Sequence, residues 1–141
     1  MHDLSRAVID TSVLIYDLFE DSIYHDDASK LLDALSSWII PSMVIHELIW
    51  FLRGLNVDKR LAINAIFQYI IHHKTRIVPI EVDDVTKALN VIKQEGISLS
   101  RYNDKVILAV ALKLKIPLAS FDRKLRNEAI KSGIAVMPKS L

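Results

Sequence analysis

The chain has 141 residues and a formal net charge of +1 at pH 7, and 51% of its residues are hydrophobic. This length is typical of one globular domain, and the hydrophobic fraction excludes a disordered or fibrous chain. The absence of cysteine excludes disulfides and thiolate metal sites. The charge is not that of a protein that binds nucleic acid over a wide basic surface, so a polyanionic substrate would need a local basic patch or metal ions.

Residues 1–7 lack the charged-then-apolar layout of a secretion signal. Every apolar run is interrupted before the roughly 18 residues that a membrane span requires. We therefore expect a cytoplasmic protein with no membrane contact. No linker, repeat or low-complexity stretch divides the chain, so we expect one domain over residues 1–141.

Short apolar runs alternate with helical patterns along the chain. The runs predict buried strands at residues 7–9, 38–40, 76–78, 117–119 and 134–136. Between them, apolar residues recur with helical spacing at Ile63, Ile66, Phe67, Ile70 and Ile71, and on a narrower stripe at Val82, Val85, Leu89 and Ile92. Strands separated by helices require crossover connections. The fold class predicted is α/β, with a mainly parallel central sheet covered by helices on both faces.

The three glycines each follow a helical pattern. Gly54, Gly96 and Gly133 stand where a helix is expected to end in a left-handed residue. None belongs to a glycine-rich phosphate-binding loop, which removes the main support for a nucleotide-binding fold.

Two acidic residues follow predicted strands. Asp10 comes after the strand at residues 7–9, and Asp122 comes shortly after the strand at residues 117–119. The carboxyl ends of parallel strands share one edge of the sheet, where ligands bind. Because both residues precede helices, each could instead be an ordinary helix N-cap.

Glu47 lies inside a predicted helix at residues 42–52, with Val44 and Phe51 as neighbours on its face. A carboxylate among apolar side chains is costly unless it is compensated. Glu47 must therefore meet a cation, a salt-bridge partner such as an arginine, or the mouth of a cleft.

Asp104 begins the helix predicted at residues 104–111 and shares a face with Ile107, Leu108 and Ala111. An acid in a first turn also favours the helix dipole, which is the alternative explanation. Several acids that converge at one edge would repel one another unless divalent cations screened them. Oxygen ligands suit Mg²⁺ or Mn²⁺, and paired metals can activate water for phosphodiester cleavage.

Other candidate sites are weaker. His46 and Glu47 begin a zinc motif, but Trp50 replaces its second histidine, which excludes a zincin. The adjacent His72 and His73 point in different directions on a helix and are not expected to bind metal. Basic residues near the last two acids are candidates for RNA phosphate contacts or for a solvated helix surface: Arg101, Lys105, Arg123, Lys124 and Arg126.

The helix that contains Glu47 is apolar nearly all round. Trp50 and Phe51 must therefore be buried in the core or against another chain, and we favour a partner surface.

These motifs together resemble a known family. Residues 8–15, with the sequence VIDTSVLI, resemble the opening motif of PIN-domain ribonucleases, especially VapC-type toxins. Pro41 and Ser42 followed by Glu47 resemble the second motif. Residues 102–104, which lead through the next helix to residues 116–122, resemble the third and fourth motifs. The resemblance spans nearly the whole chain, in order and at the family's spacing.

The resemblance implies a PIN-like three-layer α/β/α sandwich and metal-dependent endonucleolytic cleavage of RNA with Mg²⁺ or Mn²⁺. Residue by residue, it places Asp10, Glu47, Asp104 and Asp122 on the family's metal-binding acids. Ser120 stands where the family often has threonine, and it keeps the hydroxyl group. Small polar residues that line the family's site match Thr11 and Ser12, although Ser12 could equally cap a helix. Such toxins form homodimers and are silenced by a partner antitoxin.

Three other functions remain open on the sequence alone. A housekeeping nuclease for RNA processing or ribosome maturation would share the fold and the acids. A non-catalytic RNA-binding module would usually have lost an acid, and all four are present. A phosphoacceptor receiver would have paired acids after its first strand, where Thr11 and Ser12 follow Asp10.

Overall fold

The computed structural model describes residues 5–141, in which five strands form one parallel sheet. The strands are β1 (Arg6–Ile9), β2 (Ser37–Pro41), β3 (Thr75–Val78), β4 (Leu118–Ala119) and β5 (Val136–Met137). Their order across the sheet is β3-β2-β1-β4-β5, and every neighbouring pair is parallel. The five predicted strands and the parallel sheet are confirmed. The expectation about the N-terminal sequence falls partly on residues 1–4, outside the described part.

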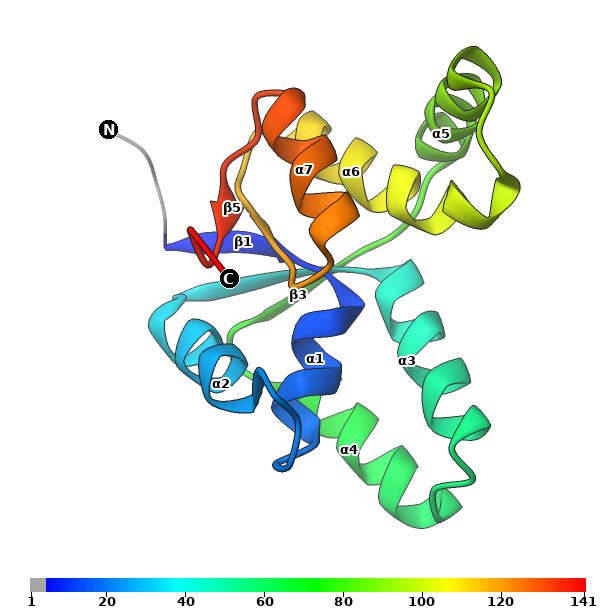
Figure 1. The fold of residues 1–141 in the computed structure, drawn as a ribbon. Helices are drawn as coiled ribbons and strands as arrows, with labels where there is room; N and C mark the ends of the chain where they lie inside the picture. Colours follow the sequence, from blue (N-terminus) through cyan, green and yellow to red (C-terminus); the bar gives the residue numbers. More distant parts are fainter. Residues whose placement is uncertain (1–4) are drawn as a thin grey trace.

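Helices cover both faces of this sheet (Figure 1). They are α1 (Thr11–Leu18), α2 (His25–Ala34), α3 (Ser42–Gly54), α4 (Lys59–Ile71), α5 (Val82–Glu95), α6 (Tyr102–Leu114) and α7 (Arg123–Lys131), with a short 3₁₀ helix, η1 (Leu99–Arg101), before α6. Helices α1, α2 and α4 lie on one side of the sheet, and α6 and α7 lie on the other. Helix α5 projects beyond the sheet and packs on α6. The predicted three-layer sandwich is confirmed.

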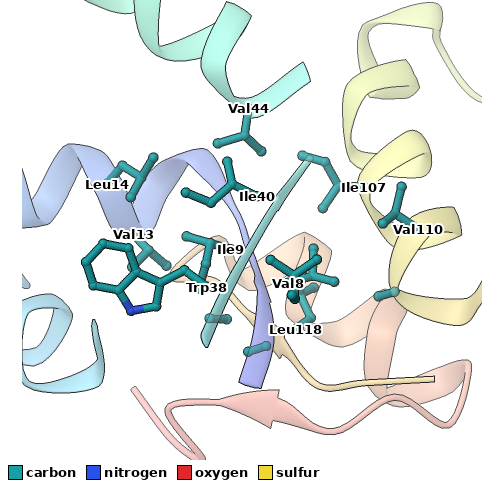
Figure 2. Packing of buried hydrophobic residues seen from close by; sticks show 14 of the residues in the cluster. Val8, Ile9, Val13, Leu14, Trp38, Ile40, Val44, Ile107, Val110 and Leu118 are labelled. Atoms are coloured by element: carbon teal, nitrogen blue, oxygen red, sulfur yellow. The ribbon is translucent and has the colours of Figure 1, made fainter. Parts of the chain in front are cut away.

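The core is packed on both faces of β1, the central strand. Side chains alternate along a strand, so Val8 and Ile9 point to opposite faces. Figure 2 shows Val8 on the same side as Leu118 and the α6 residues Ile107 and Val110, and Ile9 on the side of Val13, Leu14 and Trp38. The register agrees, because Val8 is aligned with Leu118 of β4. All of these side chains are buried.

The order of the strands determines where a site can form. The chain leaves β1 for β2 and β3 on one side, and it returns to β4 and β5 on the other side of β1. The gap between β1 and β4 is therefore the topological switch point, where open parallel sheets bind ligands. Asp10 follows β1 and Asp122 follows β4, so both stand at this point.

In α4 and α5 the residues that are buried differ from the apolar stripes that the spacing predicts. In α4 the only fully buried residue is Tyr69, whereas Ile63, Phe67, Ile70 and Ile71 are exposed. In α5 the inward face carries Asp84, Ala88 and Ile92, and Val82 is exposed. The helices themselves are confirmed. The buried carboxylate of Asp84 is stabilised by Lys113 of α6 at 2.9 Å, a pairing between distant segments that spacing does not reveal.

Two local features also differ from the prediction. Helix α2 was not predicted, because only Ala28 and Leu32 of its ten residues are buried and its pattern is mostly polar. Gly54 ends α3 without a left-handed conformation, which Asn56 adopts two residues later with φ 55°. Gly96 and Gly133 have positive φ at helix ends, as predicted.

None of the helices within residues 5–141 combines the length and apolarity needed to cross a bilayer.

We expect Leu14→Ala to lower the free energy of unfolding by about 2–5 kcal/mol, because it opens a cavity between α1 and the sheet. Leu14 is fully buried, whereas Leu61 of α4 is 65% exposed. Leu61→Ala is therefore the control and should change stability by less than about 0.5 kcal/mol. Urea unfolding of both variants measures the difference, and equal effects would contradict the packing described for α1.

Candidate active site

Asp10 stands at the N-cap position of α1, yet its carboxylate makes no capping hydrogen bond. Instead, its Oδ2 accepts hydrogen bonds from Ser12 Oγ and Ser120 Oγ, both at 2.7 Å. The residue is only 6% exposed. The N-cap alternative therefore does not explain Asp10, whose carboxylate is held by two hydroxyl groups from opposite ends of the sequence.

Both serines are themselves fixed by the backbone that follows β4. Ser12 Oγ accepts a hydrogen bond from the N–H of Phe121 at 3.0 Å, and Ser120 Oγ accepts one from the N–H of Asp122 at 3.0 Å. Each hydroxyl group thus accepts a hydrogen bond from a backbone N–H and donates one to Asp10. The segment after β1 and the segment after β4 are joined by this network at the switch point.

Glu47 extends from α3 toward the same edge of the sheet. Its Oε1 accepts a hydrogen bond from Thr11 Oγ1 at 2.6 Å, and its Oε2 accepts one from Asn103 Nδ2 at 3.1 Å. Among the described residues no ion pair to Glu47 is found, so the arginine alternative is not supported there. Glu47 is half-buried and oriented by neutral donors from α1 and α6.

Asp104 lies in the first turn of α6 and is paired with Arg101. Its Oδ2 accepts from Arg101 Nε at 3.3 Å and lies 3.2 Å from Arg101 Nη2. Within the described part of the chain, no donor contacts the other oxygen, Oδ1. One oxygen of this carboxylate is therefore oriented by the guanidinium, and the other is available.

Asp122 is the N-cap of α7. Its Oδ1 accepts hydrogen bonds from the backbone N–H groups of Lys124 at 2.9 Å and Leu125 at 3.2 Å. The capping alternative is thus correct for Asp122, although it uses only one carboxylate oxygen. A capping role fixes the side chain at the edge of the site and does not exclude a second role for Oδ2.

The electrostatics show that the four acids share one environment. Burial raises the pKa of Asp10 from 3.8 to about 6, with further contributions from Glu47 and Asp122 and an opposing effect from its serine hydrogen bonds. Burial likewise raises the pKa of Asp104 to about 6, with repulsion from Asp122 and Asp10 and an opposing effect from Arg101. The structure therefore brings Asp10, Glu47, Asp104 and Asp122 to one edge of the sheet.

The site offers carboxylate oxygens and no nitrogen or sulfur ligands, a donor set that suits hard cations such as Mg²⁺ or Mn²⁺. Among residues 5–141 no three acids or histidines lie close enough, in these rotamers, to surround an ion. Each carboxylate has at least one oxygen that accepts hydrogen bonds from protein donors. A cation would offset both the burial and the mutual repulsion that raise the pKa of Asp10 and Asp104, so the residues present fit a divalent metal.

The basic residues predicted near the site divide into two groups. Lys105 is buried between Glu95 and Glu128, and Arg126 donates to the carbonyl oxygens of Ser120 and Pro138. These two side chains are engaged inside the protein, so the structure does not favour the predicted RNA contact for Lys105. Arg101 is engaged by acids in the same way. Only Arg123 and Lys124 are exposed.

Two contributors to the site were missed at the level of sequence. Asn103 orients Glu47, and its position directly before Asp104 in the first turn of α6 is the feature that could have indicated it. Glu128 contacts both Arg101 and Lys105. It lies on the inward face of α7 with Leu125 and Ala129, but nothing in the local pattern names its partners.

His72, which was not expected to bind metal, is held by packing at the end of α4. His72 caps the end of α4 and stacks on Trp38 with ring centroids 4.1 Å apart. Burial lowers the pKa of His72, with the neighbouring His73 and Lys74 acting in the same direction. A neutral, stacked imidazole accounts for this residue without a metal.

We expect Asp104→Asn to stabilise the metal-free protein at pH 8 by about 1–3 kcal/mol. The pKa of Asp104 is raised to about 6 from an ordinary 3.8, so between these values the folded protein holds a proton that the unfolded chain has released. Stability therefore falls as pH rises through this window, and asparagine removes that loss. Below pH 3.8 the advantage of the variant should disappear.

Thermal unfolding from pH 3.5 to 8 measures this difference, with Asp26→Asn as the control. Asp26 is an exposed acid in the first turn of α2, so its amide variant should show no such gain. An Asp104→Asn protein that is less stable than wild type at pH 8 would contradict the electrostatic account of the site.

Comparison with solved structures finds the same fold in three other proteins. VapC20 of Mycobacterium tuberculosis, described as a Sarcin-Ricin loop cleaving toxin, matches with a TM-score of 0.73 and 18% identity over 86% of this chain and 94% of that chain. A toxin–antitoxin complex from Klebsiella pneumoniae matches with a TM-score of 0.62 and 20% identity over 95% and 98% of the two chains. VapBC2 from Rickettsia felis, bound to a DNA fragment from its promoter, matches with a TM-score of 0.66 and 16% identity over 86% and 92%.

None of the curated proteins compared matches the sequence. The PIN domain family matches residues 7–131, which include all four acids and the whole of the sheet except β5 and the first residue of β1. The chain therefore belongs to the PIN domain family.

Proposed function

We propose that this PIN-domain protein is a cytoplasmic, metal-dependent endoribonuclease and the toxin of a toxin–antitoxin pair. The observation that carries the proposal is the cluster of four acids at the switch point, where Asp10 and Asp104 have their pKa raised to about 6. A fold gains no stability from such a cluster, because it must bury like charges together. Perturbed carboxylates in this position are characteristic of functional sites.

In this proposal Asp10, Glu47 and Asp104 hold Mg²⁺ or Mn²⁺, and Asp122 completes the pocket. Divalent cations in such sites stabilise the charge of the phosphate oxygens and activate water for attack in line with the leaving oxygen. The chain's own hydroxyl groups keep the ligands in place. Ser12 and Ser120 fix one oxygen of Asp10, and Thr11 fixes one oxygen of Glu47.

The substrate class is RNA, as expected for the family. Arg123 and Lys124 directly follow Asp122 and are exposed, so they are placed to contact phosphate groups beside the pocket. Such contacts would make RNA binding weaker as salt concentration rises. VapC20 is described as cleaving the Sarcin-Ricin loop, so ribosomes belong among the substrates to be tested.

The proposed antitoxin would cover the apolar surface of α3 and α4. Trp50 and Phe51 of α3 are 60% and 38% exposed, which excludes the alternative that these side chains are buried in the core, and Phe67 of α4 is 54% exposed. Beside them, a cavity of about 360 Å³ between the two helices is lined by Ile49, Ile63 and Ile66 among others. An exposed apolar surface of this kind indicates a protein partner. The expected homodimer stays a prediction.

The first experiment measures cleavage of a pool of structured and single-stranded RNA and of intact ribosomes, with Mn²⁺ or Mg²⁺ and with EDTA. We expect cutting by wild type that requires the metal and falls at least about 100-fold in Asp104→Asn, because that variant keeps the shape of the side chain and removes its charge. Arg53→Gln, on the exposed end of α3, is the control and should cut as wild type does.

Cutting that persists in EDTA or in Asp104→Asn would contradict the proposed site. No cutting by folded, metal-loaded wild type across this pool would favour a non-catalytic RNA-binding module. Metal-dependent cutting with no antitoxin gene beside the toxin gene would favour the housekeeping nuclease.

The partner is tested by co-expression with the product of a small reading frame immediately upstream. We expect this product to co-purify with wild type and to suppress RNA cleavage. Trp50→Glu should weaken the complex by at least about tenfold, since it places a charge in an apolar contact. Ile130→Glu, on an exposed position of α7, is the control. Unchanged binding of Trp50→Glu would show that the partner lies elsewhere.

A further inference from the structure

Alternating charges form a continuous path from α5 to the candidate active site. Glu95 of α5 lies 3.1 Å from Lys105 of α6, and Lys105 lies 3.0 Å from Glu128 of α7. Glu128 contacts Arg101, which in turn lies 3.2 Å from Asp104. The last member of the path, Asp104, is one of the four acids. The positions of the other charged side chains therefore affect the orientation of its carboxylate.

Glu128 is the fixed point of this path. Its Oε2 accepts a hydrogen bond from Lys105 Nζ, and its Oε1 accepts one from Arg101 Nη2. The side chain of Lys105 is only 5% exposed, and that of Glu128 is 21% exposed. A carboxylate with one oxygen held by a buried ammonium group has little freedom, so its other oxygen offers a position prepared for a guanidinium.

Arg101 shares one positive charge between two carboxylates. Its Nη2 contacts Glu128 Oε1 and Asp104 Oδ2, and its Nε also donates to Asp104 Oδ2. A divalent cation held by Asp104 would lie close to this guanidinium and would be repelled by it. Because Glu128 already holds one side of Arg101, the guanidinium can leave Asp104 without losing its other ion pair.

We propose that Arg101 is the resident counter-ion of Asp104, which a divalent cation displaces, and that Glu128 is the positioning residue that retains the guanidinium when it leaves. The inference rests on the proposed function in one respect, which is that Asp104 holds the cation. Arg101 then limits the cost of assembling four acids before the cation arrives, and it competes with the cation for one of them.

This arrangement gives the two side chains opposite effects on cation binding. Removal of Arg101 removes the competitor, so cation affinity should rise. Removal of the charge of Glu128 leaves Asp104 as the only carboxylate partner of Arg101 among residues 5–141, so the ion pair at the site should strengthen and cation affinity should fall. A simple effect of net charge would not make the action of Glu128 depend on Arg101.

The test is calorimetric titration of Mn²⁺ into wild type, Arg101→Met, Glu128→Gln and the double variant, without RNA. We expect Arg101→Met to tighten Mn²⁺ binding about three- to tenfold and Glu128→Gln to weaken it by a similar factor. In the Arg101→Met background, Glu128→Gln should change the affinity less than about twofold, because its effect passes through the arginine.

Glu95→Gln is the matched control, since it removes the same charge from a residue that contacts Lys105 but not Arg101. It should change Mn²⁺ affinity less than about twofold, and Arg101→Lys should bind Mn²⁺ more weakly than Arg101→Met because it retains the positive charge. Thermal unfolding of every variant establishes that each is folded at the temperature of the titration.

The proposal is overturned if Arg101→Met weakens Mn²⁺ binding, which would mean that the guanidinium orients Asp104 for the metal. It is also overturned if Glu128→Gln acts equally in both backgrounds or if Glu95→Gln matches it, because either result indicates long-range charge alone. Wild type that binds no Mn²⁺ would overturn the metal site itself. Wild type that binds Mn²⁺ with the expected cycle but cuts no RNA would overturn only the proposed function.

Discussion

The burial of four like charges together at one edge of the sheet is the constraint on which the rest of the structure depends. Asp10 follows the central strand and is 6% exposed, so its charge is neither solvated by water nor neutralised by a described basic residue. Buried carboxylates of this kind favour unfolding or protonation unless the protein compensates them. The compensation comes from hydroxyl groups at Asp10 and Glu47 and from a guanidinium at Asp104.

The hydroxyl network depends in turn on the topology of the sheet. Ser120 and Asp10 are 110 positions apart in sequence, yet the pairing of β1 with β4 brings them into hydrogen-bond contact. The N–H of Asp10 donates to the carbonyl oxygen of Ala119 at 2.9 Å, which fixes the register of the two segments relative to each other. The residues of the site are therefore held by a ladder whose stability comes from the packing of Val8, Ile9 and Leu118. Packing in the core therefore offsets the free-energy cost of burying the acids.

The sequence predicts the positions of the acids better than their surroundings. The alternation of strands and helices was sufficient to place Asp10 and Asp122 at one edge, because parallel strands share their carboxyl ends. It could not distinguish the two, since both occupy N-cap positions and only Asp122 caps its helix. The pairing of Arg101 with Glu128 joins segments 27 residues apart, and it follows from the docking of α7 on α6. Periodicity likewise predicted the helix α4. It did not predict that the apolar stripe of α4 faces outward, because residue spacing shows that a stripe exists but not which surface it faces.

The exposed apolar surface and the acidic site are connected through α3. Glu47 belongs to the site, and Trp50 and Phe51 on the exposed surface follow it by three and four residues, which is one helical turn of about 5.4 Å. Phe51 also contacts Phe19 at the end of α1, with ring centroids 6.2 Å apart. A partner that packed against this surface would therefore contact the helix that presents Glu47 and would lie next to the helix that carries its donor, Thr11. A partner on the apolar surface would therefore lie one helical turn from the carboxylate of Glu47 without entering the site.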